Sequence, residues 1–301
     1  MILTVTQEND AVRIDKYLCG ECESFSRSYL QRLLKDGSVS VNGCSVKASY
    51  KVVVGDVISV DIPRQSEPDI LPEEIPLHIL YEDSDVIVVN KPKGMVVHPD
   101  QTYSSGTLVN ALLYHCRDLS GINGVKRPGI VHRIDRDTTG SIIACKNDEA
   151  HKNIAAQLKD HTIRRVYAAI VHGVIKEEEG TVHTQIGRSP RDRKKMAVVT
   201  NGGKEAVTHF KVLRRFRNYT YVECRLETGR THQIRVHMAH IHHPLVGDEV
   251  YCSLKPPVSD LIGQTLHAGI LGFVHPSTGV YIETEAPLPG YFQNLLETLP
   301  E

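Results

Sequence analysis

Two carboxylates stand two residues apart in the stretch GIVHRIDRDTTGSIIA, residues 129–144. Arg133 comes two residues before Asp135, and Arg136 directly precedes Asp137. An aspartate that a neighbouring arginine keeps ionised can act as a nucleophile or as a base. The same residues would also suit an exposed turn whose ion pairs contribute little to stability. The pattern by itself leaves open whether Asp135 or Asp137 reacts, or neither.

Three other groups of reactive residues give weaker signals. The CxxC at 19–22 has no second cysteine pair at the spacing that a structural zinc ion needs. The five histidines within 232–243 lack the HExxH pattern of a metalloprotease. The DTTG at 137–140 resembles the Asp-Thr-Gly of aspartic proteases, but it has an extra threonine and no second copy. We therefore expect no metal ion, and the lack of a glycine-rich phosphate loop predicts no nucleotide cofactor.

The composition excludes several classes of protein. The chain has 301 residues, of which 24% are charged and 41% hydrophobic, and its formal net charge is -1. No apolar run approaches the roughly 18 residues of a membrane span, and the start lacks a signal-peptide pattern. Seven scattered cysteines are an odd number and indicate reduced thiols. The sequence predicts a cytoplasmic protein with no membrane partner.

Charge is distributed unevenly along the chain. Basic residues gather in RSPRDRKK at 188–195 and in KVLRRFR at 211–217, whereas acids gather in KEEEG at 176–180. Such segregation suits a protein that meets a polyanion on one face. Solvated loops produce the same pattern, so charge alone does not decide between the two.

A proline-rich, acidic stretch at 62–76 predicts a linker between two domains. We place a small α+β domain at 1–64, the linker at 65–79 and a large domain at 80–301. In the large domain, strand-like and helical segments follow one another without a regular rhythm. This order favours an α+β fold with a mixed, mainly antiparallel sheet and flanking helices. The strand expected at 164–173 alternates, so that Tyr167 lies on the face opposite Val166.

Residues 12–62 resemble a small RNA-binding module named after a small-subunit ribosomal protein, the S-four type. The resemblance depends on RIDKYL, SRS, GSVSVNG and GDVISV in that order. Basic side chains beside its two helices can contact RNA phosphates. Together with the basic segment at 188–195, they give a predicted RNA-binding set of Arg27, Arg32, Lys35, Lys47, Arg188, Arg191 and Lys194.

The large domain resembles the ribosomal large-subunit pseudouridine synthases, which isomerise uridine in RNA to its carbon-linked form. The matching motifs are YEDSDVIVVNKPKGMVVHP, GIVHRIDRDTTGSIIACK, RRVYAAIVHG and TGRTHQIRVHMAHIHHPLVGDEVY, in the order of the family. Ile134 and His242 depart from the usual residues of that family, at positions without a charged role. The resemblance implies no cofactor. It implies an RNA partner, with large-subunit ribosomal RNA favoured and transfer RNA as the alternative; a non-catalytic ribosome-assembly factor is the rival class.

The resemblance also assigns roles to individual residues. Asp135 would be the reactive carboxylate, and Asp137 a residue of the following turn. Arg235 would keep Asp135 ionised, and Tyr167 would stack on a uracil that has left the RNA helix. The predicted substrate-binding residues are Arg133, His132, Arg230 and Leu266.

Overall fold

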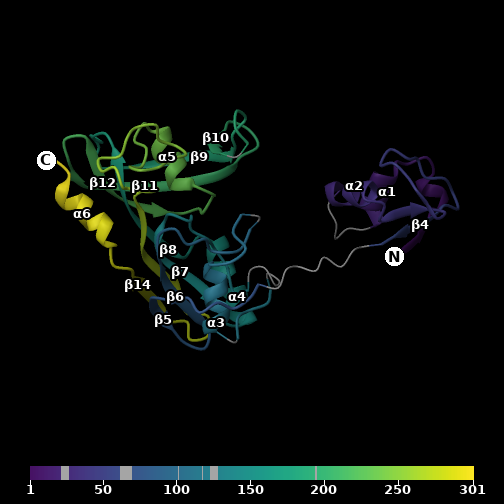
Figure 1. The fold of residues 1–301 in the computed structure, drawn as a ribbon, viewed down its shortest axis with the longest axis horizontal. Coiled ribbons are helices and arrows are strands. Elements are labelled where there is room, and N and C mark those ends of the chain that lie inside the picture. The colour runs from purple at the N-terminus through teal and green to yellow at the C-terminus, as the bar shows by residue number, and fades with distance from the viewer. Residues whose placement is uncertain (22–26, 62–69, 101, 117, 123–127, 194) are drawn as a thin grey trace. The chain divides into compact units, whose positions relative to one another are not determined.

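In the computed structural model the chain forms two compact units, residues 1–67 and residues 68–301 (Figure 1). The structure describes residues 1–21, 27–61, 70–100, 102–116, 118–122, 128–193 and 195–301, and of residues 27–29 and 32 only the backbone. No helix within these ranges is both long enough and apolar enough to cross a membrane.

The first unit consists of two helices and a four-stranded antiparallel sheet with the strand order β1-β4-β2-β3. Apolar side chains of both helices, such as Leu18 and Leu30, are buried together with Ile58 of the sheet. The turn between β2 and β3 has positive φ angles at Asn42 and Gly43, as the Asn-Gly sequence predicts for a tight hairpin. The elements are β1 (Ile2–Thr4), the short 3-10 helix η1 (Gln7–Asn9), α1 (Ile14–Glu21), α2 (Arg27–Lys35), β2 (Val39–Val41), β3 (Cys44–Ser45) and β4 (Val57–Val60).

The second unit is built on one ten-stranded sheet with the order β10-β9-β11-β12-β8-β13-β7-β6-β5, and β14 pairs with β13. Only β7 and β13 run parallel among the strand pairs described, so the expected mixed, mainly antiparallel α+β fold is confirmed. The strands are β5 (Ile79–Glu82), β6 (Val86–Lys91), β7 (Thr139–Cys145), β8 (Arg164–His172), β9 (Glu179–Arg188), β10 (Met196–Val198), β11 (Lys204–Arg215), β12 (Tyr219–Leu226), β13 (Leu266–Val274) and β14 (Tyr281–Glu285).

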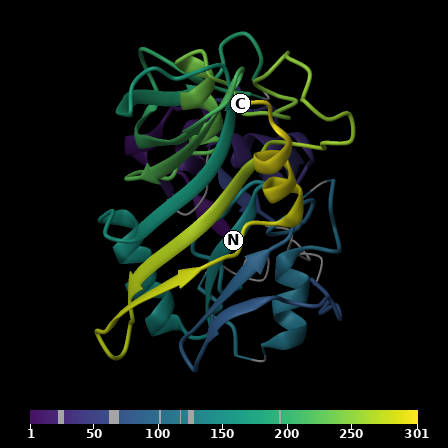
Figure 2. The same cartoon turned by 90° about the vertical axis from the view of Figure 1, so that its left-hand side faces the viewer.

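Four helices cover this sheet: α3 (Leu108–His115), α4 (Asp148–Lys159), α5 (Gln233–His240) and α6 (Gly290–Thr298). Helix α4 packs against β7, and α5 packs against β10 and β11. Figure 2 shows the long strands β8 and β13 side by side through the middle of the sheet. Strand β8 alternates as predicted, because Tyr167 belongs to the main core while Ile170 belongs to the cluster beneath α6.

Part of the segment that the sequence predicts as a linker, 65–79, is built into the second unit. Ile70 and Leu77 pack against its core. The Asn110 side-chain amide donates a hydrogen bond to the carbonyl of Leu71, and the backbone N–H of Glu73 donates to the carbonyl of Asn110. The predicted domain limits at 64 and 80 stay predictions.

Candidate active site

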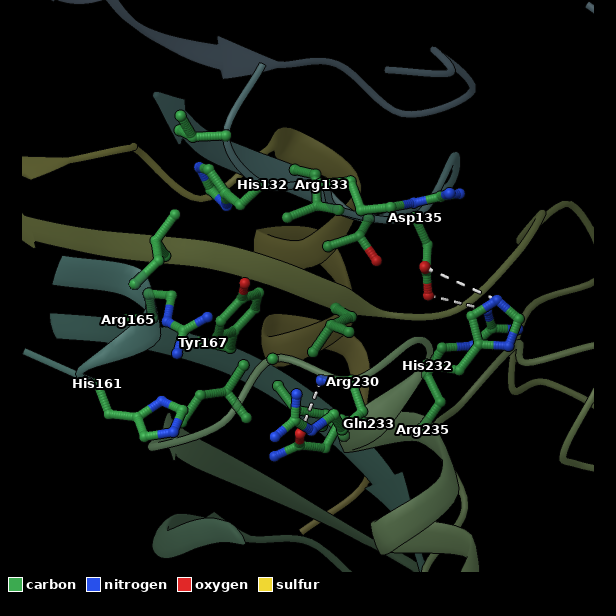
Figure 3. A pocket seen from close by; sticks show the side chains of 18 of the residues that line it. His132, Arg133, Asp135, His161, Arg165, Tyr167, Arg230, His232, Gln233 and Arg235 are labelled. Atoms are coloured by element: carbon green, nitrogen blue, oxygen red, sulfur yellow. Dashed lines mark hydrogen bonds and ion pairs between the residues drawn. The ribbon is translucent and has the colours of Figure 1, made fainter. Parts of the chain in front are cut away.

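A cavity of about 400 Å³ lies between the loop before β7, strand β8 and the start of α5 (Figure 3). Its lining brings together residues that are up to 135 positions apart in the chain. All seven residues that the sequence predicts for catalysis or substrate binding line it, namely Asp135, Arg235, Tyr167, Arg133, His132, Arg230 and Leu266.

Asp135 and Arg235 are in direct contact. The Arg235 Nη1 donates to Asp135 Oδ2 at 2.9 Å, and the side chain of Asp135 is 18% exposed. Arg235 also donates from Nε and Nη2 to the two carboxylate oxygens of Asp248, at 2.7 and 2.9 Å. A planar guanidinium bound in this two-pronged way has a fixed orientation. Asp248 therefore aims the remaining nitrogen of Arg235 at Asp135.

Asp248 is a site residue that the sequence analysis missed. Its Oδ1 accepts hydrogen bonds from the backbone N–H groups of Val250 and Tyr251 as well as from Arg235. Burial by itself would raise the pKa of Asp248, but Arg235 and these backbone donors hold it below its usual value. Burial likewise opposes the charge of Arg235, yet both carboxylates raise its pKa. Both partners are therefore ionised at neutral pH.

His232 is the second residue missed. It precedes α5 in a left-handed conformation, with φ of 57°, which turns its ring toward the cavity. Its Nε2 lies 3.8 Å from Asp135 Oδ1, and its Nδ1 lies 2.8 Å from the hydroxyl of Tyr251. Burial lowers the pKa of His232 although Asp135 acts in the opposite sense. The imidazole is thus a neutral neighbour of the carboxylate at pH 7.

Lys91 holds the loop that carries Asp135. Its side chain is fully buried, and Nζ donates to the carbonyl oxygens of Pro92, Met95 and Arg136 at 2.8 to 2.9 Å. Burial lowers the pKa of Lys91 to about 7, against the effect of the nearby aspartates. Because one of the three acceptors directly follows Asp135 in the chain, Lys91 fixes the backbone of the reactive loop.

Asp137 has a different environment from Asp135. Its carboxylate accepts hydrogen bonds from Nε and Nη2 of Arg136, whose Nη1 binds the hydroxyl of Tyr103. It lines a neighbouring hollow of about 300 Å³ instead of the cavity beside Tyr167. The DTTG sequence ends at Gly140, where φ is +108° and an added Cβ would overlap the backbone of Ala268. The motif thus serves the close parallel approach of β7 to β13.

The wall opposite Asp135 is suited to a flat, partly polar ring. Tyr167 is 7% exposed, and Leu266 is 4% exposed. The backbone N–H of Ile143 donates to Nε2 of His132 at 3.1 Å. Burial, helped by the charge of Arg165, lowers the pKa of His132 to about 3, so this ring is neutral and carries its proton on Nδ1. The cavity can hold a base between an aromatic ring, aliphatic side chains and neutral donors.

Comparisons with known proteins agree with this geometry. A family model described as RNA pseudouridylate synthase matches residues 85–240. An uncharacterized RNA pseudouridine synthase of Bacillus subtilis is 54% identical over 297 residues, which cover 99% of this chain and 97% of that protein. This chain belongs to the RNA pseudouridylate synthase family. It is therefore an isomerase that acts on uridine in RNA.

Three further matches concern a named relative, a solved structure and the first unit. A protein of Zymomonas mobilis named ribosomal large subunit pseudouridine synthase D is 45% identical over 307 residues, covering 99% of this chain and 96% of that protein. The solved structure of human RNA pseudouridylate synthase domain containing 1 has a TM-score of 0.60 at 23% identity, covering 76% of this chain, and shares the fold. An S4 domain model matches residues 12–58, as the resemblance in the first unit predicts.

The predicted RNA-binding residues of the synthase lie on both units. Lys35 at the end of α2 and Lys47 after β3 are exposed. Arg188 and Arg191 are exposed at the end of β9 and in the loop that follows it. The side chains of Arg27 and Arg32 and the whole of Lys194 lie outside the described residues. Lys195 of the same loop donates to the carbonyl of Val250, which attaches the basic loop beside the active site.

One group of potential metal ligands occurs among the described side chains, away from the cavity. The ligand atoms of Glu82, His115 and Cys116 lie within 4.8 Å of one another. Glu82 already binds the His115 ring at 2.9 Å and the ammonium of Lys146 at 3.1 Å. Because a neighbouring cation occupies the carboxylate, we assign no metal ion to this group.

Proposed function

We propose that this enzyme isomerises specific uridines of large-subunit ribosomal RNA, with Asp135 as its reactive carboxylate. The ribosomal substrate is supported by the name and the 45% identity of the Zymomonas mobilis relative. We propose the cytoplasm as the location of the enzyme, in keeping with that substrate. The observation that carries the role of Asp135 is its 2.9 Å contact with Arg235 inside the cavity. The adjacent Asp137 is bound instead by its chain neighbour Arg136.

The reaction consumes no external oxidant, reductant or donor group, because the product is an isomer of the substrate, and one carboxylate is enough for the route that we propose. Asp135 either attacks C1′ of the ribose or takes a proton from C2′. In both cases the bond from C1′ to N1 breaks, and its electron pair leaves with the uracil. The uracil turns within the site, and C5 bonds to C1′ while Asp135 returns to its starting form. Loss of the C5 proton and protonation of N1 complete the isomerisation.

The other residues of the cavity serve these steps. Arg235 stabilises the ionised form of Asp135 before the reaction. Tyr167 stacks on the uracil, a contact that contributes roughly 1–3 kcal/mol per base, and so retains the detached ring. A base must leave the RNA stack to enter the cavity, at a cost of a few kcal/mol. Arg133, an exposed residue at the rim, supports the RNA in that displaced form.

The first prediction tests the choice of carboxylate. Asp135→Asn should abolish release of tritium from RNA that carries C5-tritiated uridine, because the amide can neither attack C1′ nor accept the proton. Asp137→Asn is the matched control and should retain most of the activity, since its contacts are with Arg136. Circular dichroism should show both variants folded. Full activity of Asp135→Asn, or loss only in Asp137→Asn, would show that we chose the wrong aspartate.

Mapping of pseudouridines distinguishes the two substrate classes. In cells that lack the gene, chemical labelling should reveal missing pseudouridines in large-subunit ribosomal RNA. Missing sites only in transfer RNA would assign the alternative substrate.

A second prediction concerns the first unit, whose exposed lysines are proposed to contact phosphates. The double variant Lys35→Gln/Lys47→Gln should bind substrate RNA more weakly and with a salt dependence that is flatter by about 1 to 2 in the slope of log K against log salt. Lys152→Gln is the control, because Lys152 is exposed on α4 and paired with Glu149. Filter-binding titrations between low and moderate salt measure both slopes. An unchanged slope in the double variant would remove these lysines from the RNA interface.

A further inference from the structure

Arg165 occupies an unusual position in the cavity. It stands two residues before Tyr167 on β8 and therefore on the same face of the strand. Figure 3 shows its guanidinium beside the Tyr167 ring, across the cavity from Asp135. The neighbouring Arg164 is half-exposed and pairs with Glu283 at 2.7 Å. The two adjacent arginines thus have opposite surroundings.

The guanidinium of Arg165 is buried and only partly bonded. The side chain is 6% exposed, and its Nη2 donates to the carbonyl of Glu227 at 2.8 Å. Its buried Nε has no hydrogen-bond partner among the residues that the structure describes. A buried donor without a partner costs about 1–3 kcal/mol, and more where the group is charged. A substrate that binds in the cavity can remove this cost.

The charge of Arg165 is not balanced locally. Burial lowers the pKa of Arg165, the nearby cation Arg230 lowers it further, and only the ionisable hydroxyl of Tyr167 acts in the opposite sense. In the described part of the chain no carboxylate pairs with it, whereas Arg235 binds two. A buried cation without a counter-ion is strongly unfavourable unless an anion joins it. The free enzyme therefore carries an unused positive charge at the base-binding wall.

The backbone nearby leaves room for this guanidinium. A Cβ at position 229 would lie 2.6 Å from Nη1 of Arg165, so any residue larger than glycine would displace it. Gly229 precedes Arg230 at the turn that leads into α5. Gly229 thus leaves the space that the Arg165 guanidinium occupies, and the hydrogen bond to the Glu227 carbonyl keeps the guanidinium there.

We infer that Arg165 binds the negative charge of the detached uracil. This inference rests on the proposed role of Asp135. Before the reaction the charge is on the Asp135 carboxylate; after C1′–N1 cleavage Asp135 is a neutral ester or acid, and the uracil carries the charge over N1, O2 and O4. Arg235 stays bound to Asp248 and cannot follow that charge. Arg165, with the neutral Nδ1–H donor of His132 nearby, receives it at the opposite wall.

The charge returns when the new bond forms. The electron pair of the uracil anion joins C5 to C1′, and the bond from C1′ to the Asp135 oxygen returns its pair to the carboxylate. In the proton-abstraction route, Asp135 gives its proton back to C2′ at the same stage. Arg165 is thus engaged only while the base is detached, which is the condition for a donor that accelerates the step.

The test uses Arg165→Met and Arg165→Lys with two RNA substrates that carry either uridine or 5-fluorouridine at the target. Fluorine withdraws electrons and stabilises the uracil anion without help from the protein. Arg165→Met should slow single-turnover loss of the target uridine by about 10²-fold, slow loss of 5-fluorouridine by a clearly smaller factor, and leave RNA affinity unchanged. Arg165→Lys should restore part of the rate. Arg164→Met, next in the strand, should match the wild type on both substrates.

Three outcomes would overturn the inference. Equal losses on both substrates would indicate a structural role, and a loss of RNA affinity with a normal single-turnover rate would place Arg165 on a phosphate. Wild-type rates for Arg165→Met would dismiss it from the reaction. Asp135→Asn, measured in parallel, should be inert on both substrates. Activity of that variant would refute the role of Asp135, whatever the Arg165 variants show.

Discussion

The two walls of the cavity differ in how their charges are balanced. On the wall formed by the reactive loop and α5, which we call the Asp135 wall, one guanidinium lies between two carboxylates, those of Asp135 and Asp248. On the wall formed by β8, which we call the Arg165 wall, a buried guanidinium has no carboxylate partner within the described ranges. Each wall contains a buried arginine, but only the arginine of the Asp135 wall is paired with carboxylates before substrate binds.

This difference indicates two ways of preparing an active site. In the Asp135 wall the buried charges are paired with one another, so the geometry of this wall is fixed before RNA binds. The Arg165 wall keeps an unsatisfied donor, and its burial cost is relieved only by a ligand. In the reaction that we propose, the first wall positions the carboxylate that starts it. The second is suited to the species that exists only during it.

The largest effect on the free energy of unfolding is expected where the charge balance of the Asp135 wall is broken. Asp248→Asn would leave one Arg235 nitrogen facing an amide and should lower the free energy of unfolding by about 3–5 kcal/mol. Because Arg235 then loses its fixed orientation, single-turnover pseudouridine formation should fall more than tenfold. Urea unfolding measures the loss of stability, and the rate is measured at urea concentrations at which the variant is still folded. Glu249→Gln, the exposed neighbour, should change the stability by less than about 0.5 kcal/mol. Equal stability of the two variants would show that Arg235 does not need Asp248.

A smaller effect is expected at the ring of the Arg165 wall. Tyr167→Leu should slow single-turnover isomerisation by about 10- to 100-fold, because stacking on the base contributes roughly 1–3 kcal/mol. Tyr167→Phe keeps the ring and should retain most of the rate. If both variants lose the same amount, the hydroxyl matters and the stacking explanation is wrong. Released free uracil in the Leu variant, measured by chromatography, would indicate that the detached base escapes.

Sequence patterns and family resemblance predicted residues on both walls. The motifs placed Asp135 and Arg235 in one site although they lie 100 positions apart, and the structure shows their side chains in contact. The alternation along 164–173 put Tyr167 on one face of β8, and the same alternation would have put Arg165 beside it. The pairing of Asp135 with Arg235 came from the family resemblance, whereas the face of Tyr167 depends on periodicity within a single strand, which the sequence carries directly.

The remaining site residues depend on contacts between elements. Asp248 matters because the loop after α5 returns its carboxylate to the far edge of Arg235. Lys91 matters because its ammonium joins two carbonyls of its own following segment, those of Pro92 and Met95, to the carbonyl of Arg136 on the loop that carries Asp135. The unpaired charge of Arg165 depends on the lack of a nearby carboxylate among the described residues and on the space left by Gly229. Neither spacing nor composition records which oxygen faces which nitrogen, so these residues became visible only in three dimensions.

The last prediction concerns the stability at acid pH of helix α5, which forms part of the Asp135 wall. His237 on α5 is fully buried between the hydroxyls of Thr184 and Thr208, at 2.9 Å from each. Burial lowers its pKa to about 4, from 6.5 in the unfolded chain. The unfolded state therefore binds the additional proton between these values, so stability is present above pH 6.5 and is lost as the pH falls toward 4. At pH 5 the loss in the free energy of unfolding should be about 1–2 kcal/mol.

Urea unfolding at pH 7 and pH 5 should show this loss in the wild type and in His240→Gln, whose side chain is exposed. The loss should be smaller in His237→Gln. The same loss in all three proteins would assign the acid sensitivity to other groups, and α5 would then hold the Asp135 wall independently of His237.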